Sequence, residues 1–304
     1  MDQLNLQQKI VCFGEILWNV LPTGTVPGGA PLDIAYHLSK LGYKPLILTK
    51  IGVDKPGQKL FEVMEQYNMC TDYFQISHQL QTGKVNIISL PCNEVFYEII
   101  QPVAWDDIEW QPEYKGLLEV TQTFIYGSLS ARSANSRNTL YKLLDNMNGY
   151  KVLDINLRSP HYSYETIKDL LQHADFLKIN QSELELITGW YVNDELLEKR
   201  IEVLQNKFNI PSIVVTKGSE GAILNVEGIM FEHPGFKVKI ADTAGSGEAF
   251  LAAIITQLQQ KKSPACALEY ASASGALVAS YSGGRPQYTL DEIDEIITNT
   301  MAAP

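Results

Sequence analysis

The sequence predicts an α/β fold: a doubly wound, mostly parallel sheet with helices on both faces and a small discontinuous β lid. Short apolar runs alternate with helical patterns along most of the chain, which is typical of consecutive βα units. These runs are mostly apolar, as expected for parallel strands buried on both faces. The alternation fails over residues 72–104, where β-rich runs follow one another without a helix, and this segment is the expected lid.

The first part of the chain opens with two βα units. Apolar residues at positions 34, 35, 38 and 41 fit one face of a helix. Pro31 suits the first helical position, and Gly42 suits the residue that stops a helix. The elements predicted here are a strand at 10–13, an extended segment at 15–22, a helix at 32–42, a strand at 46–51 and a helix at 58–67.

The expected lid combines two separate segments. Residues 82–90 and 94–101 are rich in β-forming side chains and are joined by turn residues 91–93. No helix intervenes, so we expect an antiparallel excursion from the main sheet. Because two strands alone are marginally stable, the lid needs partners, and we assign it residues of about 15–26 together with about 72–104.

The second part of the chain returns to the α/β alternation. It shows no repeat and no Pro- or Ser-rich linker, so residues 1–304 are expected to form a single domain. The predicted strands are 123–126, 151–155, 176–179 and 213–216, followed by a hairpin of 222–226 and 229–232. The predicted helices are 133–147, 164–173, 182–188, 194–208, 244–260, 264–281 and 290–299.

The charge and composition exclude several classes of protein. A formal net charge of −11 argues against a nucleic-acid or anionic-membrane surface, although a small phosphorylated ligand could still be held by backbone N–H groups and a metal. The four cysteines are widely spaced, which fits reduced thiols better than a zinc site or disulfides. Residues 1–9 lack a signal-peptide pattern, and the apolar stretch 265–281 contains Glu269 and several serines. We expect a cytoplasmic protein with neither a nucleic-acid nor a membrane partner.

Residues 241–253 contain the strongest local pattern. An apolar, β-like segment with Val238 and Ile240 runs into the small residues 244–247, and a strongly helical run follows. At such a turn, backbone N–H groups converge at the positive end of the helix dipole, which favours a bound anion such as a phosphoryl group. Glu248 lies in the first helical turn. A plain connection, with Glu248 favoured there by the dipole alone, is the alternative interpretation.

Other polar residues follow the predicted strands. In a doubly wound sheet, ligands bind beyond the carboxyl ends of the strands, so these residues are expected to share one edge. Each also has a simpler interpretation as a turn residue or a helix cap. The residues are Asn19 and Asp33 on either side of Gly28 and Gly29, then Asp154, Asn156 and Arg158, then Asn180 and Glu183, and finally the segment 216–221.

Three common nucleotide and hydrolase patterns are missing from the sequence. The first strand leads into Gly14-Glu-Ile-Leu, which does not fit a G-x-G-x-x-G dinucleotide fingerprint. The chain contains no G-x-x-x-x-G-K-[ST] P-loop and no G-x-S-x-G nucleophile elbow. The five histidines show no metal-ligand spacing.

Five motifs occur in a fixed order over nearly the whole chain. They are Gly14-Glu-Ile-Leu-Trp18, Gly28-Gly-Ala-Pro31, Asn180-Gln-Ser-Glu183, Thr216-Lys-Gly-Ser-Glu-Gly221 and Asp242-Thr-Ala-Gly-Ser-Gly247. With these motifs the chain resembles the ribokinase/PfkB carbohydrate kinase family, and looks most like its fructokinase branch. The resemblance implies a ribokinase-like fold and phosphoryl transfer from ATP to a sugar hydroxyl, with Mg²⁺ and often a monovalent cation such as K⁺.

The resemblance also implies roles for individual residues. The expected anion hole is the backbone of Ala244, Gly245, Ser246 and Gly247, with Glu248 at the position of the general base. The expected sugar-binding residues are Glu15, Asn19, Gly28, Gly29, Asp33 and Arg158. The expected nucleotide-side residues are Asn180, Glu183, Thr216, Gly218 and Gly221, with Glu183 also acting through water on Mg²⁺. Asp242 and Thr243 are expected near the monovalent cation, and the lid closes on the sugar.

Three residues depart from the pattern of the family. Glu248 replaces an aspartate, Asn19 replaces an aspartate and Asp33 replaces an asparagine, so an acid and an amide exchange places on the sugar side. An active sugar kinase with an altered sugar preference is one hypothesis. A degenerate member that binds sugar or nucleotide without useful turnover is the second, and a kinase of nucleosides or other small alcohols is a third. A homodimer formed through the lid is a further option.

Overall fold

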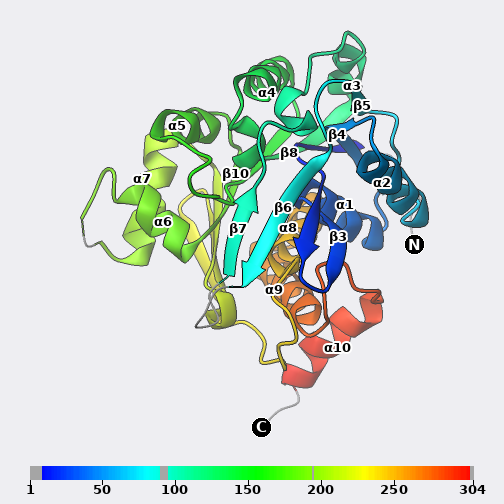
Figure 1. Ribbon diagram of the computed structural model, residues 1–304. Helices are drawn as coiled ribbons and strands as arrows, with labels where there is room; N and C mark the ends of the chain where they lie inside the picture. The colour runs from blue at the N-terminus through cyan, green and yellow to red at the C-terminus, as the bar shows by residue number, and fades with distance from the viewer. Residues whose placement is uncertain (1–8, 90–94, 194, 302–304) are drawn as a thin grey trace.

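The computed structural model describes residues 9–89, 95–193 and 195–301 (Figure 1). Its centre is a nine-stranded sheet with the strand order β13-β12-β11-β10-β9-β8-β1-β4-β5. The seven strands β5, β4, β1, β8, β9, β10 and β11 are parallel. Strands β12 and β13 form an antiparallel hairpin at one edge. The strands are β1 (Lys9–Phe13), β4 (Leu46–Gly52), β5 (Phe74–Ser77), β8 (Thr121–Gly127), β9 (Tyr150–Asp154), β10 (Phe176–Asn180), β11 (Ser212–Thr216), β12 (Ala222–Val226) and β13 (Ile229–His233). The predicted mostly parallel sheet is confirmed.

Helices cover both faces of this sheet. In β1, Val11 and Phe13 pack into one hydrophobic cluster while Ile10 and Cys12 pack into another, because alternate side chains point to opposite faces. The first cluster contains residues of α3 to α7, and the second contains residues of α1, α2, α8 and α9. The helices are α1 (Ala30–Lys40), α2 (Lys55–Gln66), α3 (Tyr114–Val120), α4 (Ala134–Asn146), α5 (Tyr164–Gln172), α6 (Gln181–Thr188), α7 (Leu197–Phe208), α8 (Ser246–Gln259), α9 (Pro264–Ala279) and α10 (Leu290–Met301).

A second, four-stranded sheet forms the lid, and Figure 1 shows two of its strands, β6 and β7, in front of the large sheet. Its order is β3-β2-β6-β7, from β2 (Leu17–Leu21), β3 (Gly24–Gly28), β6 (Gly83–Ser89) and β7 (Val95–Ile99). The predicted lid is present, with two corrections. Strand β5 lies within 72–104 but pairs with β4 in the large sheet, because it follows α2 as the second strand of a parallel βαβ unit. The strands β2 and β6 pair in parallel, so the lid is a mixed sheet. The predicted turn at 91–93 lies outside the described residues.

One predicted strand is wrong. Residues 234–240, including Val238 and Ile240, form no strand. Pro234 offers no N–H group to a ladder, and Gly235 has a φ of +80°, so the chain turns away from the sheet after β13. The segment that precedes the turn at residues 244–247 is therefore a loop. Helix α3 was also not predicted.

The helix boundaries follow the expected signals closely. Pro31 lies in the first turn of α1, and Gly42, with a φ of +88°, follows its end. No helix within the described ranges is long and apolar enough to cross a membrane.

Candidate active site

The turn before α8 offers unpaired backbone donors. Gly245 is the N-cap of α8 with a φ of +73°, and no side chain caps this helix. Within the described part of the chain, the N–H groups of Gly245 and Gly247 donate no hydrogen bond, whereas the N–H of Ala244 donates to Asp242 Oδ1 at 3.0 Å. Ser246 donates through its Oγ to the carbonyl oxygen of Thr243 at 2.9 Å. Two unpaired N–H groups at the positive end of a 14-residue helix are suited to hold an anion.

Gly245 is required here for two reasons. Its positive φ is unfavourable for residues with a side chain. A Cβ atom at this position would also collide with the carbonyl oxygen of Gly284, which lies in the segment after α9. The turn is therefore held against residues 282–286, and this close approach determines its shape.

A buried lysine that the sequence reasoning missed lies beside the turn. Lys178 on β10 donates to Asp154 Oδ1 at 2.9 Å, and the two side chains are 10% and 2% exposed. A Cβ atom added to Gly247 would lie 3.2 Å from Lys178 Nζ, which places the ammonium next to the anion site. Burial alone would lower the pKa of Lys178, but the carboxylates of Asp154, Glu248 and Glu183 outweigh it and raise the pKa. The sequence feature that could have indicated Lys178 is a single charged residue within the otherwise apolar run 176–179.

Glu248 lies in the first turn of α8 and is partly buried. Burial raises the pKa of its carboxyl group above the ordinary value, and Asp154 adds to this effect. The ammonium of Lys178 acts in the opposite direction, followed by the guanidinium of Arg158. A carboxylate whose pKa is raised, next to a turn that can hold an anion, is suited to act as a proton acceptor.

Asn180 and Glu183 form the reciprocal cap at the start of α6. Asn180 Oδ1 accepts from the N–H of Glu183 at 2.9 Å, and Glu183 Oε2 accepts from the N–H of Asn180 at 3.0 Å. Glu183 Oε1 also accepts from the N–H of Leu157 at 2.8 Å, which fixes the loop after β9. The simple interpretation of this motif as a helix cap is correct, and the same contacts hold the buried Glu183 carboxylate near Lys178 and Asp154.

A cavity of about 360 Å³ adjoins the turn before α8. Its lining includes three residues that were predicted on the nucleotide side. It also includes three residues of the 242–247 motif and one residue that follows this motif. They are Thr216, Gly218 and Gly221, together with Thr243, Ser246, Gly247 and Phe250. Val238, Ile240, Ala276 and Ala279 supply apolar walls, so the segment that is not a strand still lines the cavity. Its size lies in the range of small-molecule sites.

Glu15, Asn19, Gly28, Gly29 and Asp33 lie where the lid meets α1. The backbone of Ala30, the first residue of α1, lowers the pKa of Glu15, so this carboxyl group lies near the start of α1, whose N-cap is Gly29. A Cβ atom at Gly28 would collide with the side-chain amide of Asn19. Asp33 forms an ion pair with Arg285, a residue that the sequence reasoning did not select. These five expected sugar-side residues therefore share one region, which Arg285 joins from the C-terminal part of the chain.

Arg158 connects the two halves of the site. Its side chain is exposed and donates to the carbonyl oxygen of its neighbour Leu157 at 3.3 Å. Its charge lowers the pKa of both Glu15 and Glu248.

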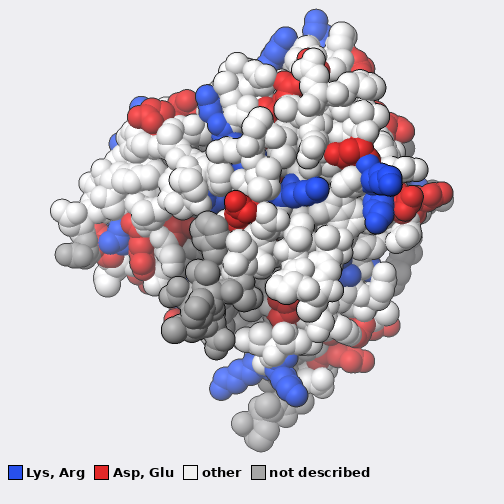
Figure 2. Space-filling model, in the orientation of Figure 1, with Lys and Arg blue, Asp and Glu red and all other residues white. Residues whose placement is uncertain are grey.

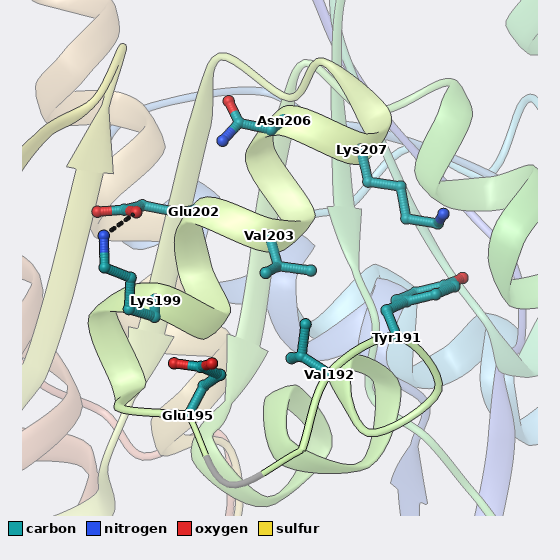
Figure 3. A pocket seen from close by; sticks show the side chains of 8 residues that line it. All are labelled: Tyr191, Val192, Glu195, Lys199, Glu202, Val203, Asn206 and Lys207. Atoms are coloured by element: carbon teal, nitrogen blue, oxygen red, sulfur yellow. Dashed lines mark hydrogen bonds and ion pairs between the residues drawn. The ribbon is translucent and has the colours of Figure 1, made fainter.

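Another hollow, of about 490 Å³, lies on the surface between α7 and the segment that follows α6 (Figure 3). It contains none of the predicted site residues, and its Lys199–Glu202 ion pair at 2.7 Å is exposed. Figure 2 shows acidic and basic side chains interspersed over the visible face, without a large patch of either sign. Of these two hollows, the one at the strand ends is the better candidate, because it lies beside buried charges and unpaired backbone donors.

The mostly parallel, doubly wound sheet with a separate β lid is a ribokinase-like fold. The sequence model of the pfkB family carbohydrate kinases matches residues 1–289, and the chain belongs to this family. It is accordingly an ATP-dependent carbohydrate kinase.

Curated relatives and solved structures agree with this family. The chain is similar to a protein named probable fructokinase-7 of Arabidopsis thaliana, with 27% identity over 99% of this chain and 96% of the relative. It is 26% identical to a fructokinase of Klebsiella pneumoniae over 90% of this chain and 94% of the relative. Its fold matches a Xylella fastidiosa fructokinase with bound ATP, with a TM-score of 0.85, 20% identity and coverage of 97% and 100%. A Vibrio cholerae fructokinase with fructose, ADP and potassium matches with a TM-score of 0.81, 19% identity and coverage of 96% and 99%.

Proposed function

We propose that the protein transfers the γ-phosphoryl group of ATP to a hydroxyl group of a free sugar, with Glu248 as the general base. The observation that carries this proposal is the convergence of three features at one sheet edge. They are the free N–H groups of Gly245 and Gly247, the carboxylate of Glu248 and the cavity lined by Thr216, Gly218 and Gly221. The named fructokinases among the relatives support a free sugar as the acceptor.

In the proposed reaction, Glu248 takes the proton from the sugar hydroxyl group. The hydroxyl oxygen forms a bond to the γ-phosphorus while the bond from this phosphorus to the β,γ-bridging oxygen breaks, and ADP leaves. The backbone at 244–247 stabilises the charge on the transferring group, mainly through Gly245 and Gly247, since Ala244 already donates to Asp242. The ammonium of Lys178 adds positive charge beside this turn.

The donor set fits a hydrated Mg²⁺. Within the described ranges, no group of three or more His, Cys, Asp or Glu is arranged to hold a metal by itself. Mg²⁺ typically keeps several waters and uses one or two carboxylates plus substrate phosphates. Glu183 would act through water, because both of its oxygens accept backbone N–H groups, and Asp154 Oδ2 is a buried acceptor without a partner among the described residues. Bound Mg²⁺ would neutralise phosphate charge.

Asp242 and Thr243 remain the proposed neighbours of K⁺. The two carboxylate oxygens of Asp242 accept from the N–H groups of Ala244 and Gly283, at 3.0 and 3.1 Å. This carboxylate thus joins the anion turn to the segment after α9, where backbone carbonyls could complete a cation site. Turnover measured in KCl and in choline chloride tests the requirement.

The proposed function is tested by ADP release across a panel of free hexoses, pentoses and nucleosides. We expect turnover with at least one sugar, loss of turnover in Glu248→Gln, and retained or higher turnover in Glu248→Asp, since aspartate restores the shorter side chain. The exchanged positions of Asn19 and Asp33 support a sugar preference different from that of fructokinases, and normal preference for fructose would contradict this part.

A second candidate is a member that binds sugar or ATP with little turnover. The observation that favours it is the set of three departures from the family pattern, at positions 19, 33 and 248. Sugar and ATP binding by the wild-type protein, without ADP release for any sugar of the panel, would support this candidate over the active kinase.

A further inference from the structure

The segment 282–287, which follows α9, is fixed along one face of α1. The carbonyl oxygen of Pro286 accepts from the hydroxyl of Tyr36 at 2.7 Å, and that of Gly284 lies 3.0 Å from His37 Nε2. The contacts on α1 come from residues i, i+3, i+4 and i+7, which share one helix face. They are made by Asp33, Tyr36, His37 and Lys40.

His37 is the buried anchor of this segment. Its side chain is fully buried, and burial lowers the pKa of its ring to about 4, so the ring is neutral at physiological pH. Since the carbonyl oxygen of Gly284 can only accept, Nε2 carries the proton, and Nδ1 accepts from the hydroxyl of Tyr288 at 3.0 Å. The position of the segment is therefore set by neutral hydrogen bonds.

The opposite side of the same segment contacts the anion turn. Gly284 packs directly against Gly245, and the N–H of Gly283 donates to Asp242 Oδ2 at 3.1 Å. The segment 282–287 thus lies between the helix that bears Asp33 and the turn that offers the anion site.

Arg285 extends from this segment towards the lid. Its side chain is 9% exposed and donates to Asp33 on α1 and to the carbonyl oxygen of Pro27 on β3. Among the described residues, neither Asp33 Oδ2 nor Arg285 Nε has a hydrogen-bond partner. A buried ion pair contributes little net stability after desolvation, whereas it fixes the orientation of both groups. This arrangement leaves one oriented carboxylate oxygen of Asp33 near Pro27, where the lid meets α1.

We propose that Arg285 is a positioning residue for the sugar, because its guanidinium orients Asp33 so that Oδ2 accepts a hydrogen bond from a sugar hydroxyl group. This inference rests on the proposed function, which places Asp33 on the sugar side. The ion pair also offers the acceptor without net charge, which favours a neutral polyol over a sugar that carries its own carboxylate next to Asp33. Arg285 thereby contributes to the choice of sugar from a position 252 residues away in sequence from Asp33.

The test compares Arg285→Gln, Arg285→Lys, Asp33→Asn and the double variant Asp33→Asn/Arg285→Gln. The control is Lys40→Gln, which removes a contact between α1 and Gln287 on the same segment but touches no sugar-side residue. The readouts are kcat, KM for the sugar, KM for ATP, and the shift in Tm caused by the sugar or by ATP. Gluconate and neutral hexoses are compared as ligands.

We expect Arg285→Gln and Asp33→Asn each to raise KM for the sugar by roughly tenfold or more, with KM for ATP unchanged within about twofold. Arg285→Lys should give an intermediate value, because it keeps the charge and loses the fork. The double variant should be no worse than Asp33→Asn alone, since Arg285 acts through Asp33. Lys40→Gln should behave as wild type.

A raised KM for ATP or a lowered kcat, with unchanged KM for the sugar, would overturn the inference in favour of a role in holding the anion turn. If Arg285→Gln does not fold, the double variant, which leaves no unpaired charge, is compared with Asp33→Asn instead. A wild-type protein without turnover refutes the proposed function. The sugar-dependent shift in Tm then decides the inference: its loss in Arg285→Gln supports it, and its absence in wild type overturns it.

Discussion

At the residue scale, Glu15 shows how a buried carboxyl group serves both the fold and the site. It is 5% exposed, and burial raises its pKa to about 7. The N–H groups of Glu15 and Ala30 and the charge of Arg158 act in the opposite direction. Its carboxyl group lies near the start of α1, where Gly29 offers no side-chain cap.

This pKa makes the stability of the protein depend on pH. The native carboxyl group of Glu15 holds its proton up to about pH 7, whereas the unfolded group loses it near 4.5. Its stabilising contribution is complete below pH 4.5 and is lost as the pH rises through 7. From pH 4.5 to pH 8, the free energy of unfolding of the wild type should fall by about 3 kcal/mol relative to that of Glu15→Gln, because glutamine does not titrate. Urea unfolding at both pH values measures this, and an equal difference at both would contradict it.

The raised pKa of Glu248 predicts the pH dependence of catalysis. A general base must be ionised, so kcat/KM should fall on the acid side at a pH above the ordinary range of a carboxyl group. Lys178→Met removes the charge that lowers the pKa of Glu248, and it should move this acid limb to higher pH. Lys199→Met, on the exposed surface of α7, is the control and should leave the profile unchanged. An identical profile for Lys178→Met would show that Glu248 does not titrate there.

At the scale of elements, the turn before α8 depends on the packing of two glycines from different parts of the chain. Gly245→Ala places a Cβ atom against the carbonyl oxygen of Gly284, so the turn must move. We expect kcat/KM to fall on the order of a hundredfold. Gly42→Ala is the matched control, since Gly42 also has a positive φ but no atom within 4 Å of the added Cβ. A similar loss of activity in both variants would assign the effect to backbone strain instead.

The same scale shows what the sequence could and could not predict. Helix ends marked by Pro31 and Gly42 were predictable, because their signals are local. The pairing of β5 with β4 was not, because a four-residue strand carries little pattern of its own. Motif residues such as Gly245 could be selected from their order along the chain. Arg285 could not, because its partner Asp33 is distant in sequence and the pair forms only in the folded molecule.

At the scale of the whole molecule, the lid presents apolar side chains on the face that carries Asn19. The register pairs Asn19 with Val26 and Ile87 with Tyr97, and the spacing along β6 places these pairs on one face. Val26 and Tyr97 are 46% and 55% exposed. Such a face is suited to be covered by a second copy of the chain.

A homodimer through this face is the expected result in solution. Tyr97→Lys should shift the protein towards a monomer in sedimentation velocity, because it places a charge in the covered face. Ile88→Lys is the control, since Ile88 is also exposed but lies on the opposite face of the lid. A wild-type monomer, or equal effects of both variants, would argue against this interface.

The ion pair between Asp33 and Arg285 also has a consequence for how this chain can diverge. Replacing either residue alone leaves a mostly buried charge without its partner, which is costly, whereas replacing both removes the penalty. The two positions should therefore be inherited together among descendants of this sequence. A lineage that regains asparagine at position 33 is expected to lose arginine at position 285 in the same interval, and with it the present choice of sugar.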